Sequence, residues 1–206
     1  TGATIADSFT MATVHFTDVT IADSTIGVVG GQPPVVALTM SSVASSTISI
    51  SGSSIHGRMT AIKMEALTES TLSFSHAHVD ASSHEASALY YGWTSALDVL
   101  SVTNSTVAAA SSTLVAAQPP IQTSRSAAAL KVMTLSNSRI AISGSNLTTA
   151  TKYSANILNL AIAEAASCIS IEGSSLTTTC CDTLWETECA CATTRCSSSA
   201  GSRRRR

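Results

Sequence analysis

The sequence predicts an all-β fold: a right-handed parallel β-helix, a single-stranded, pectin-lyase-like β-solenoid of about six coils. The stretch Thr47–Ile55 recurs about five more times, and its apolar residues alternate with polar ones as strand side chains do. Aromatic residues are 4% of the chain and charged residues 12%, which predicts an aliphatic core with Ser and Thr on the outward positions. The alternative is a β-sandwich, which also has short strands and frequent turns.

Each copy of the stretch follows one template, Φ-x-Φ-x-(Asp/Gly/Asn/His)-(Ser/Ala)-x-Φ, where Φ is apolar. The first two apolar residues share a strand face, the Gly or Asx position is typical of a turn, and the last apolar residue restarts an inward face. We expect the second apolar residues to form one vertical column inside the protein. They are Ile21, Ile50, Phe74, Val102, Ile142 and Ile171.

A second apolar strand precedes most anchors at a nearly constant offset, so the length differences between coils are expected on one side, as loops. Its aligned residues are Leu38, Ile62, Leu89, Leu130 and Leu158.

In chain order, the first coil is expected over residues 1–28, followed by a loop at Gly30–Pro34. Coils follow over 35–57, 58–81, 82–107, 129–150 and 155–178. Ala108–Ala129 is expected to be the largest loop, and Asn156–Ala166 could equally form a short helix.

One domain with a tail is predicted: a parallel β-helix over 1–178, followed by a Cys-rich segment and a disordered basic tail over 179–206. The phrase Thr4–Ser8 repeats in Thr20–Ser24, and the first coil has no visible cap. We therefore expect a fragment of a longer solenoid.

The Cys-rich segment favours a small disulfide knot in an oxidising compartment, whose connectivity stays open. A zinc site is the alternative, although the paired C-x2-C spacing of zinc knuckles is missing. Unpaired cysteines in a tail that does not fold are a third reading. The disulfide candidates are Cys180, Cys181, Cys189, Cys191 and Cys196.

Asn104-Ser-Thr and Asn146-Leu-Thr are glycosylation sequons beside repeat corners, where an Asn is expected to face solvent. With the cysteines, they favour an extracellular or cell-surface protein.

Histidines His76, His78 and His84 are weighed as metal ligands, but no carboxylate or Cys completes a tetrahedral set, so solvent-exposed turn histidines are expected. The sequence therefore predicts no metal site and no cofactor. The aromatic residues Tyr90, Tyr91 and Trp93 fit packing under a loop better than a sugar-stacking platform.

Parallel β-helices often act on polysaccharides, and glycoside hydrolysis needs two carboxylates flanking one bond. The acids are scattered, and Asp18, Asp23, Asp80 and Asp98 are candidates by residue type only. No catalytic residue is therefore predicted, and corner acids in contact with solvent are the simpler reading.

The formal net charge of −2 and the few Lys and Arg residues argue against a nucleic-acid partner. The chain contains no run of eighteen apolar residues, so no membrane span is predicted in it. The parent protein could carry a membrane anchor.

The phrase in Thr47–Ile55 and Arg139–Leu147 resembles the β-helical ectodomain of kinetoplastid surface proteins of the dispersed gene family type. The resemblance spans about residues 4–178. It implies a large, glycosylated, cysteine-containing and membrane-anchored protein that acts as an adhesin.

These observations predict a non-enzymatic extracellular or cell-surface β-helix for adhesion, with glycans or host and cell-surface proteins as partners. The alternative is a carbohydrate-active enzyme, or a degenerate relative of one, on the same scaffold. A structural spacer without a ligand is a third reading.

Overall fold

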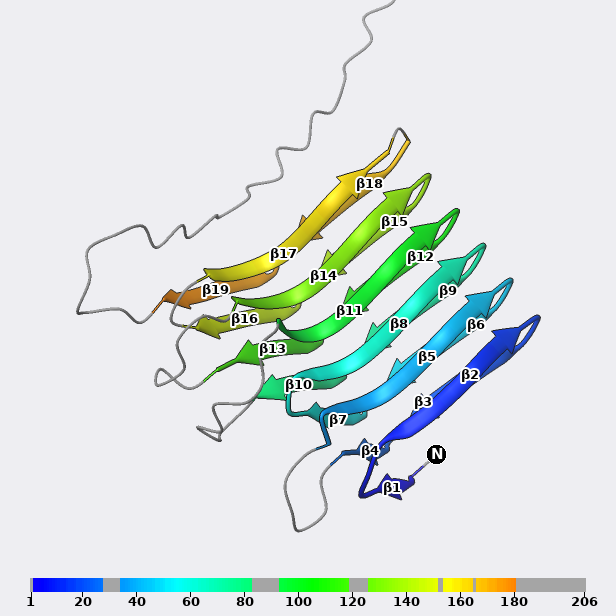
Figure 1. Cartoon of the computed structure of the whole chain (residues 1–206), viewed down its shortest axis with the longest axis horizontal. Helices are drawn as coiled ribbons and strands as arrows, with labels where there is room; N and C mark the ends of the chain where they lie inside the picture. The colour runs from blue at the N-terminus through cyan, green and yellow to red at the C-terminus, as the bar shows by residue number, and fades with distance from the viewer. Residues whose placement is uncertain are drawn as a thin grey trace, which may run out of the picture.

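The computed structural model describes residues 2–27, 34–82, 93–118, 126–151, 154–164 and 166–180. Over these residues the chain folds into three sheets of stacked parallel strands that wind as one right-handed β-helix (Figure 1). This confirms the predicted fold class. The β-sandwich alternative is wrong, because every pairing between described strands is parallel and follows coil order.

Sheet A is seven-stranded, and sheets B and C are six-stranded. Sheet A contains β1 (Thr4–Ile5), β4 (Thr25–Ile26), β7 (Ser54–Gly57), β10 (His78–Ser82), β13 (Thr113–Ala117), β16 (Asn146–Thr151) and β19 (Ser175–Cys180). Sheet B contains β2 (Phe9–His15), β5 (Val36–Ala44), β8 (Thr60–Thr68), β11 (Thr94–Thr103), β14 (Ser126–Ser136) and β17 (Ser154–Ala163). Sheet C contains β3 (Asp18–Ala22), β6 (Thr47–Ser51), β9 (Thr71–Ser75), β12 (Thr106–Ala110), β15 (Arg139–Ser143) and β18 (Cys168–Glu172).

Each coil visits sheets B, C and A in that order, and the first, incomplete coil contributes β1 alone. The long connections lie where the chain leaves sheet A for the next strand of sheet B, and every internal gap between the described ranges except residue 165 falls there. The other two corners are two residues long in nearly every coil. The prediction that length variation falls on one side of the coil is therefore confirmed.

The core lies between the three sheets and consists of aliphatic side chains, with Phe74 as its largest fully buried residue. The expected vertical column exists in sheet C, but one of its members was assigned wrongly. Ala109 of β12, not Val102, lies between Phe74 and Ile142. Val102 belongs to sheet B, where it pairs with Leu67 and Leu135.

The second column runs through sheet B as predicted for Leu38, Ile62, Leu130 and Leu158. Leu97 completes it between Ile62 and Leu130. The assignment of Leu89 to this place is thus wrong, and Leu89 itself lies outside the described residues.

Two further segments differ from expectation. The first part of Ala108–Ala129 is not a loop, because it contains the last three residues of β12 and the whole of β13. The ambiguous stretch Asn156–Ala166 is mostly strand rather than helix, since β17 extends to Ala163. In both places pairing with the neighbouring coil stabilises an extended backbone in an Ala-rich sequence.

The two short corners share one structure. Their first residue has a positive φ, as in Asn104 (φ 49°) and Gly144 (φ 53°), and their second is in most coils a buried Ser. Gly, Asn and Asp suit the first position because they tolerate left-handed backbone.

The corner serines bond to one another from coil to coil. The Ser46 amide donates to Ser70 Oγ (3.0 Å), the Ser70 amide to Ser105 Oγ (2.9 Å) and the Ser105 amide to Ser138 Oγ (3.0 Å). Each of these hydroxyls also donates to a carbonyl two residues back, as Ser105 Oγ does to Thr103 O (2.7 Å). A second ladder passes through Ser24, Ser53, Ser112, Ser145 and Ser174 at the other corner. These ladders satisfy amides that a sharp turn would otherwise leave unpaired inside the protein.

No helix in the described part of the chain is long and apolar enough to cross a lipid bilayer. The last described strand, β19, ends at Cys180, two residues beyond the boundary predicted for the β-helix.

Candidate functional site

The outward face of sheet C is lined mainly by small, uncharged side chains. Its central strands place Thr47, Thr71 and Thr106 in one row. Ser49 and Ser73 lie side by side in the next row, where their hydroxyls form a hydrogen bond (3.2 Å). The strands β6, β9 and β12 carry no charged residue, whereas Asp18 lies on the end strand β3, Arg139 on β15 and Glu172 on the end strand β18.

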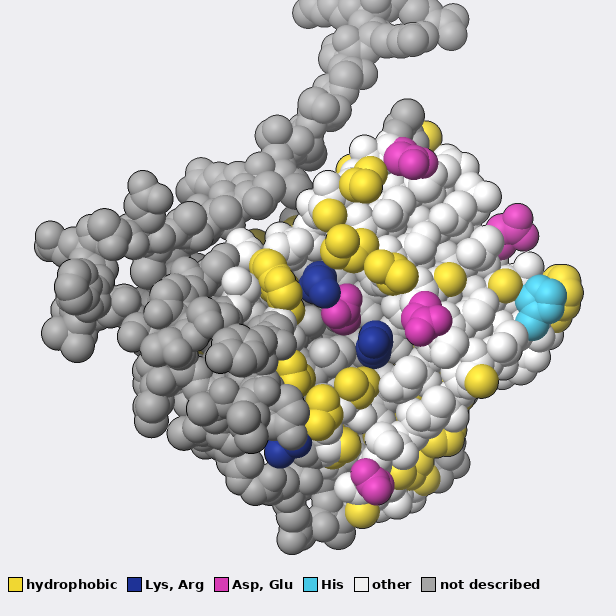
Figure 2. Space-filling view, in the orientation of Figure 1, with side chains coloured by type: hydrophobic (Ala, Val, Ile, Leu, Met, Phe, Trp, Pro, Cys, Tyr) yellow, Lys and Arg dark blue, Asp and Glu magenta, His cyan; other side chains and the backbone are white. Residues whose placement is uncertain are grey.

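The outward face of sheet B has a small charged group near its centre (Figure 2). Lys63, Asp98 and Lys131 are adjacent in the register, and Lys131 Nζ forms an ion pair with Asp98 Oδ2 (2.9 Å). Leu100 and Met133 are exposed on the same sheet.

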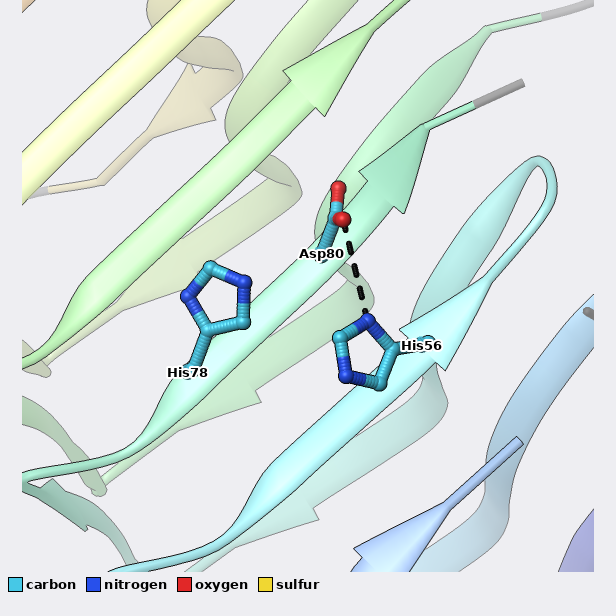
Figure 3. Close-up of side chains that lie close together, drawn as sticks. All are labelled: His56, His78 and Asp80. Carbon is cyan, nitrogen blue, oxygen red and sulfur yellow. Dashed lines mark ion pairs between the residues drawn. The ribbon is translucent and has the colours of Figure 1, made fainter. Parts of the chain in front are cut away.

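The outward face of sheet A brings together His56, His78 and Asp80 (Figure 3). Asp80 of β10 lies directly beside His56 of β7 in the register, and His78 precedes Asp80 by two residues on the same strand face. His56 Nδ1 is 3.7 Å from Asp80 Oδ2, and the two imidazole ring centroids are 5.5 Å apart. One ligand atom from each residue lies within 4.8 Å of the other two.

The carboxylate of this cluster is held in its charged form. Burial alone would raise the pKa of Asp80, but hydrogen bonds from His56 and Ser82 and the nearby charges of His56 and His78 outweigh it. The pKa of Asp80 is therefore below its ordinary value. Ser82 Oγ donates to Asp80 Oδ1, which leaves Oδ2 directed toward His56.

Two imidazoles and a carboxylate form a ligand set for divalent transition metals. All three residues are half-buried on an outward sheet face, so they remain accessible from solvent.

Of the three histidines considered from sequence, only His78 belongs to this cluster. His76 is an exposed corner residue with φ 50°, so it does not share a strand face with His78. The expectation that His78 is an exposed turn residue is wrong, since it is half-buried at the start of β10. His84 lies outside the described residues.

Sequence reasoning missed His56 as a partner of His78 and Asp80. A signal was present: the register that aligns Ile50 with Phe74 also places His56 beside Asp80. The 24-residue offset from Ile50 to Phe74 is also the offset from His56 to Asp80, so the same alignment extended to polar residues predicts that pair.

The acids considered as catalysts do not come together. Asp18 lies on sheet C, Asp23 at a corner, Asp80 on sheet A and Asp98 on sheet B. Of the aromatic group, Trp93 lies just before β11, and Tyr90 and Tyr91 are outside the described residues.

Both sequon asparagines are exposed, as expected from their place at the repeat corners. Asn104 is the first residue of its corner and accepts a hydrogen bond from Asn137 Nδ2 (2.7 Å). Asn146 is the first residue of β16.

The disulfide prediction concerns a part of the chain that is mostly not described. Cys180 ends β19, and Cys181, Cys189, Cys191 and Cys196 lie outside the described residues. Cys168 is exposed at the start of β18 and has no disulfide partner in the described ranges.

No protein-family model, curated protein or solved structure matches this chain. The resemblance to kinetoplastid surface proteins therefore stays a prediction.

Proposed function

We propose that the protein is a non-enzymatic β-helix of the extracellular space or cell surface that binds glycans through the outward face of sheet C. The observation that carries the proposal is the array of hydroxyls on the central strands of that sheet, in rows such as Thr47–Thr71–Thr106 and Ser49–Ser73. Ser and Thr hydroxyls both donate and accept hydrogen bonds, as sugar hydroxyls do. Their small size lets a sugar chain approach the backbone closely over several coils.

The four acids considered from sequence do not provide the carboxylate pair that hydrolysis needs. Hydrolysis of a glycosidic bond uses two carboxylates within about 10 Å of each other. The four candidate acids are spread over three sheets and a corner, and Asp98 is engaged by Lys131. The exposed sequons Asn104 and Asn146 support placement in a compartment where chains are glycosylated.

A glycan array probed with the purified chain tests this proposal, followed by affinity measurements on the best ligand. Ser73→Arg, which places a long cation in the middle of sheet C, should weaken binding at least about tenfold by steric exclusion. Thr148→Arg is the matched control, because Thr148 is a half-buried outward residue of sheet A.

Equal loss of affinity in both variants would place the binding surface elsewhere, and a chain that binds no glycan would refute the proposal. Release of reducing ends from a bound polysaccharide would instead favour the enzymatic alternative.

A further inference from the structure

We propose that His56, His78 and Asp80 form a binding site for a divalent transition-metal ion, with zinc as the ion that fits best. The site lies on sheet A and is independent of the glycan surface proposed on sheet C. It joins two successive coils, since His56 comes from β7 and the other two residues from β10 (Figure 3).

The donor atoms select the class of metal. Ca²⁺ and Mg²⁺ prefer sets made of oxygen alone, whereas imidazole nitrogen suits zinc and its neighbours among the transition metals. Two histidines and one carboxylate are a common set of three protein ligands to zinc, with a fourth position for water or another ligand.

The separations are close to those that a tetrahedral ion requires. Zinc bonds of about 2.0–2.1 Å place neighbouring ligand atoms roughly 3.3 Å apart. The His56 Nδ1 to Asp80 Oδ2 distance is 3.7 Å, and all three ligand atoms lie within 4.8 Å of one another. Small rotations of half-buried side chains close this difference without moving the strands that hold them.

The surroundings support a metal at this place. Ser82 Oγ donates to Asp80 Oδ1, in the way that hydrogen bonds orient metal-ligating carboxylates. The neighbours of His78 across the strands are Ser54 and Thr113, and Asp80 is flanked on the other side by Val115. None of these neighbours carries a charge that would compete with a cation for the carboxylate.

Without a metal, His78 lies beside the Asp80 carboxylate but does not form an ion pair with it. Two imidazoles face the same carboxylate, yet only His56 is within ion-pair distance of it. A bound ion would engage His78 together with the other two side chains and would link β7 to β10 outside the backbone hydrogen bonds.

The first test is isothermal titration of the full chain with zinc chloride, after free thiols have been blocked with N-ethylmaleimide so that cysteines do not bind the ion. We expect one zinc per chain. Asp80→Asn and His78→Thr should each weaken the affinity at least about tenfold, and Thr suits the second position because Thr113 is its neighbour in the register.

His76→Asn is the matched control. His76 is two residues from His78 but is exposed at a corner, and Asn occupies the first position of the other short corner, also with a positive φ, at Asn104 and Asn137. This variant should bind zinc with unchanged affinity. Equal loss in His76→Asn and His78→Thr would overturn the proposal.

A second measurement needs no variant and therefore does not depend on how the substitutions fold. In NMR spectra of the histidine rings, zinc should shift the ring nitrogens of His56 and His78 and leave those of His15 and His76 in place. Failure to saturate at one zinc per chain, or shifts confined to the other histidines, would show that the cluster does not bind the metal.

Discussion

At the scale of single residues, the corner serines are the most constrained positions that carry no function of their own. Ser105 is buried, accepts a hydrogen bond from the Ser70 amide and donates its single hydroxyl proton to Thr103 O (2.7 Å), with Leu67 O at 3.2 Å. Its hydroxyl therefore satisfies groups from two coils at once. Such a hydroxyl stabilises the fold because it pairs groups that would otherwise be unsatisfied inside an apolar core.

We predict that Ser105→Ala lowers the free energy of unfolding by about 1–3 kcal/mol, because the Ser70 amide loses its acceptor in a buried place. Urea denaturation followed by circular dichroism measures this. Ser101→Ala is the control: Ser101 is an outward residue of the same strand, and Ala66 already occupies its place on β8. Equal effects of the two changes would mean that the ladder hydrogen bond contributes little.

The second ladder contains a natural interruption at Ala77, where no hydroxyl is present to accept the Ser53 amide. The equivalent positions of neighbouring coils, Ser53 and Ser112, carry the hydroxyl. We predict that Ala77→Ser raises the free energy of unfolding by about 0.5–1.5 kcal/mol, the usual net value of one hydrogen bond. A decrease in the urea midpoint would show that the corner has no room for the hydroxyl.

The metal-ligand candidates show which residues could be predicted from sequence. His78 and Asp80 are separated by one residue, and strand alternation places them on one face. His56 is joined to them only through the pairing of coils, so that local spacing does not reveal it. Their separations and the bond from Ser82 depend on side-chain conformations, which the repeat pattern does not determine.

At the scale of strands and sheets, packing within a column depends on how residues of different size follow one another. Phe74 lies between Ile50 and Ala109 in sheet C, so that the smallest member of the column is beside the largest. This arrangement fills the core at constant spacing between coils.

We predict that Phe74→Ala lowers the free energy of unfolding by about 3–5 kcal/mol, because it would leave two adjacent alanines and a cavity between Ile50 and Ile142. Leu100→Ala is the control, since Leu100 is 54% exposed on the outward face of sheet B. Chemical denaturation of both variants checks this. A loss below about 1 kcal/mol at Phe74 would mean that neighbouring coils collapse into the space.

The error at Val102 has its cause at the same scale. Both short corners of a coil use the same chemistry, a residue with positive φ followed by Ser, and both follow an apolar strand. Val102 precedes Asn104 and Ser105 at the corner between sheets B and C, and therefore matches the template of the corner between sheets C and A. The true member of the column, Ala109, is small enough to be overlooked in a pattern of aliphatic residues.

At the scale of the whole molecule, stability is expected to follow the contacts between neighbouring coils. Aliphatic residues of the central strands, such as Ile48, Leu72 and Ile140, are fully buried. Ile21 at one end of the same stack and Ile171 at the other are only partly buried.

We predict that hydrogen exchange followed by mass spectrometry gives the slowest amides in β6, β9, β12 and β15, and faster exchange in β3 and β18. The physical reason is that, among the described strands, β3 and β18 have a neighbouring strand of sheet C on one side only. Uniform protection along the chain would show that the described coils unfold as a single unit.

Prediction from the repeat was most successful at this largest scale. The period of two and the recurring corner were enough for the coil architecture and for the place of the long connections. They did not give the paths of the connections, because no template residue occurs in them.

The corner ladders also bear on how genes for such chains change in length. The amides of Ser46, Ser70 and Ser105 each bond to the hydroxyl of the following turn, and Ser46 and Ser70 are 24 residues apart. Excision of Ser46–Glu69 by unequal recombination would join Ser45, with its φ of 48°, directly to Ser70 and so restore a complete corner. A whole turn is therefore a unit that inheritance could remove while the serine ladder at this corner keeps its bonding pattern.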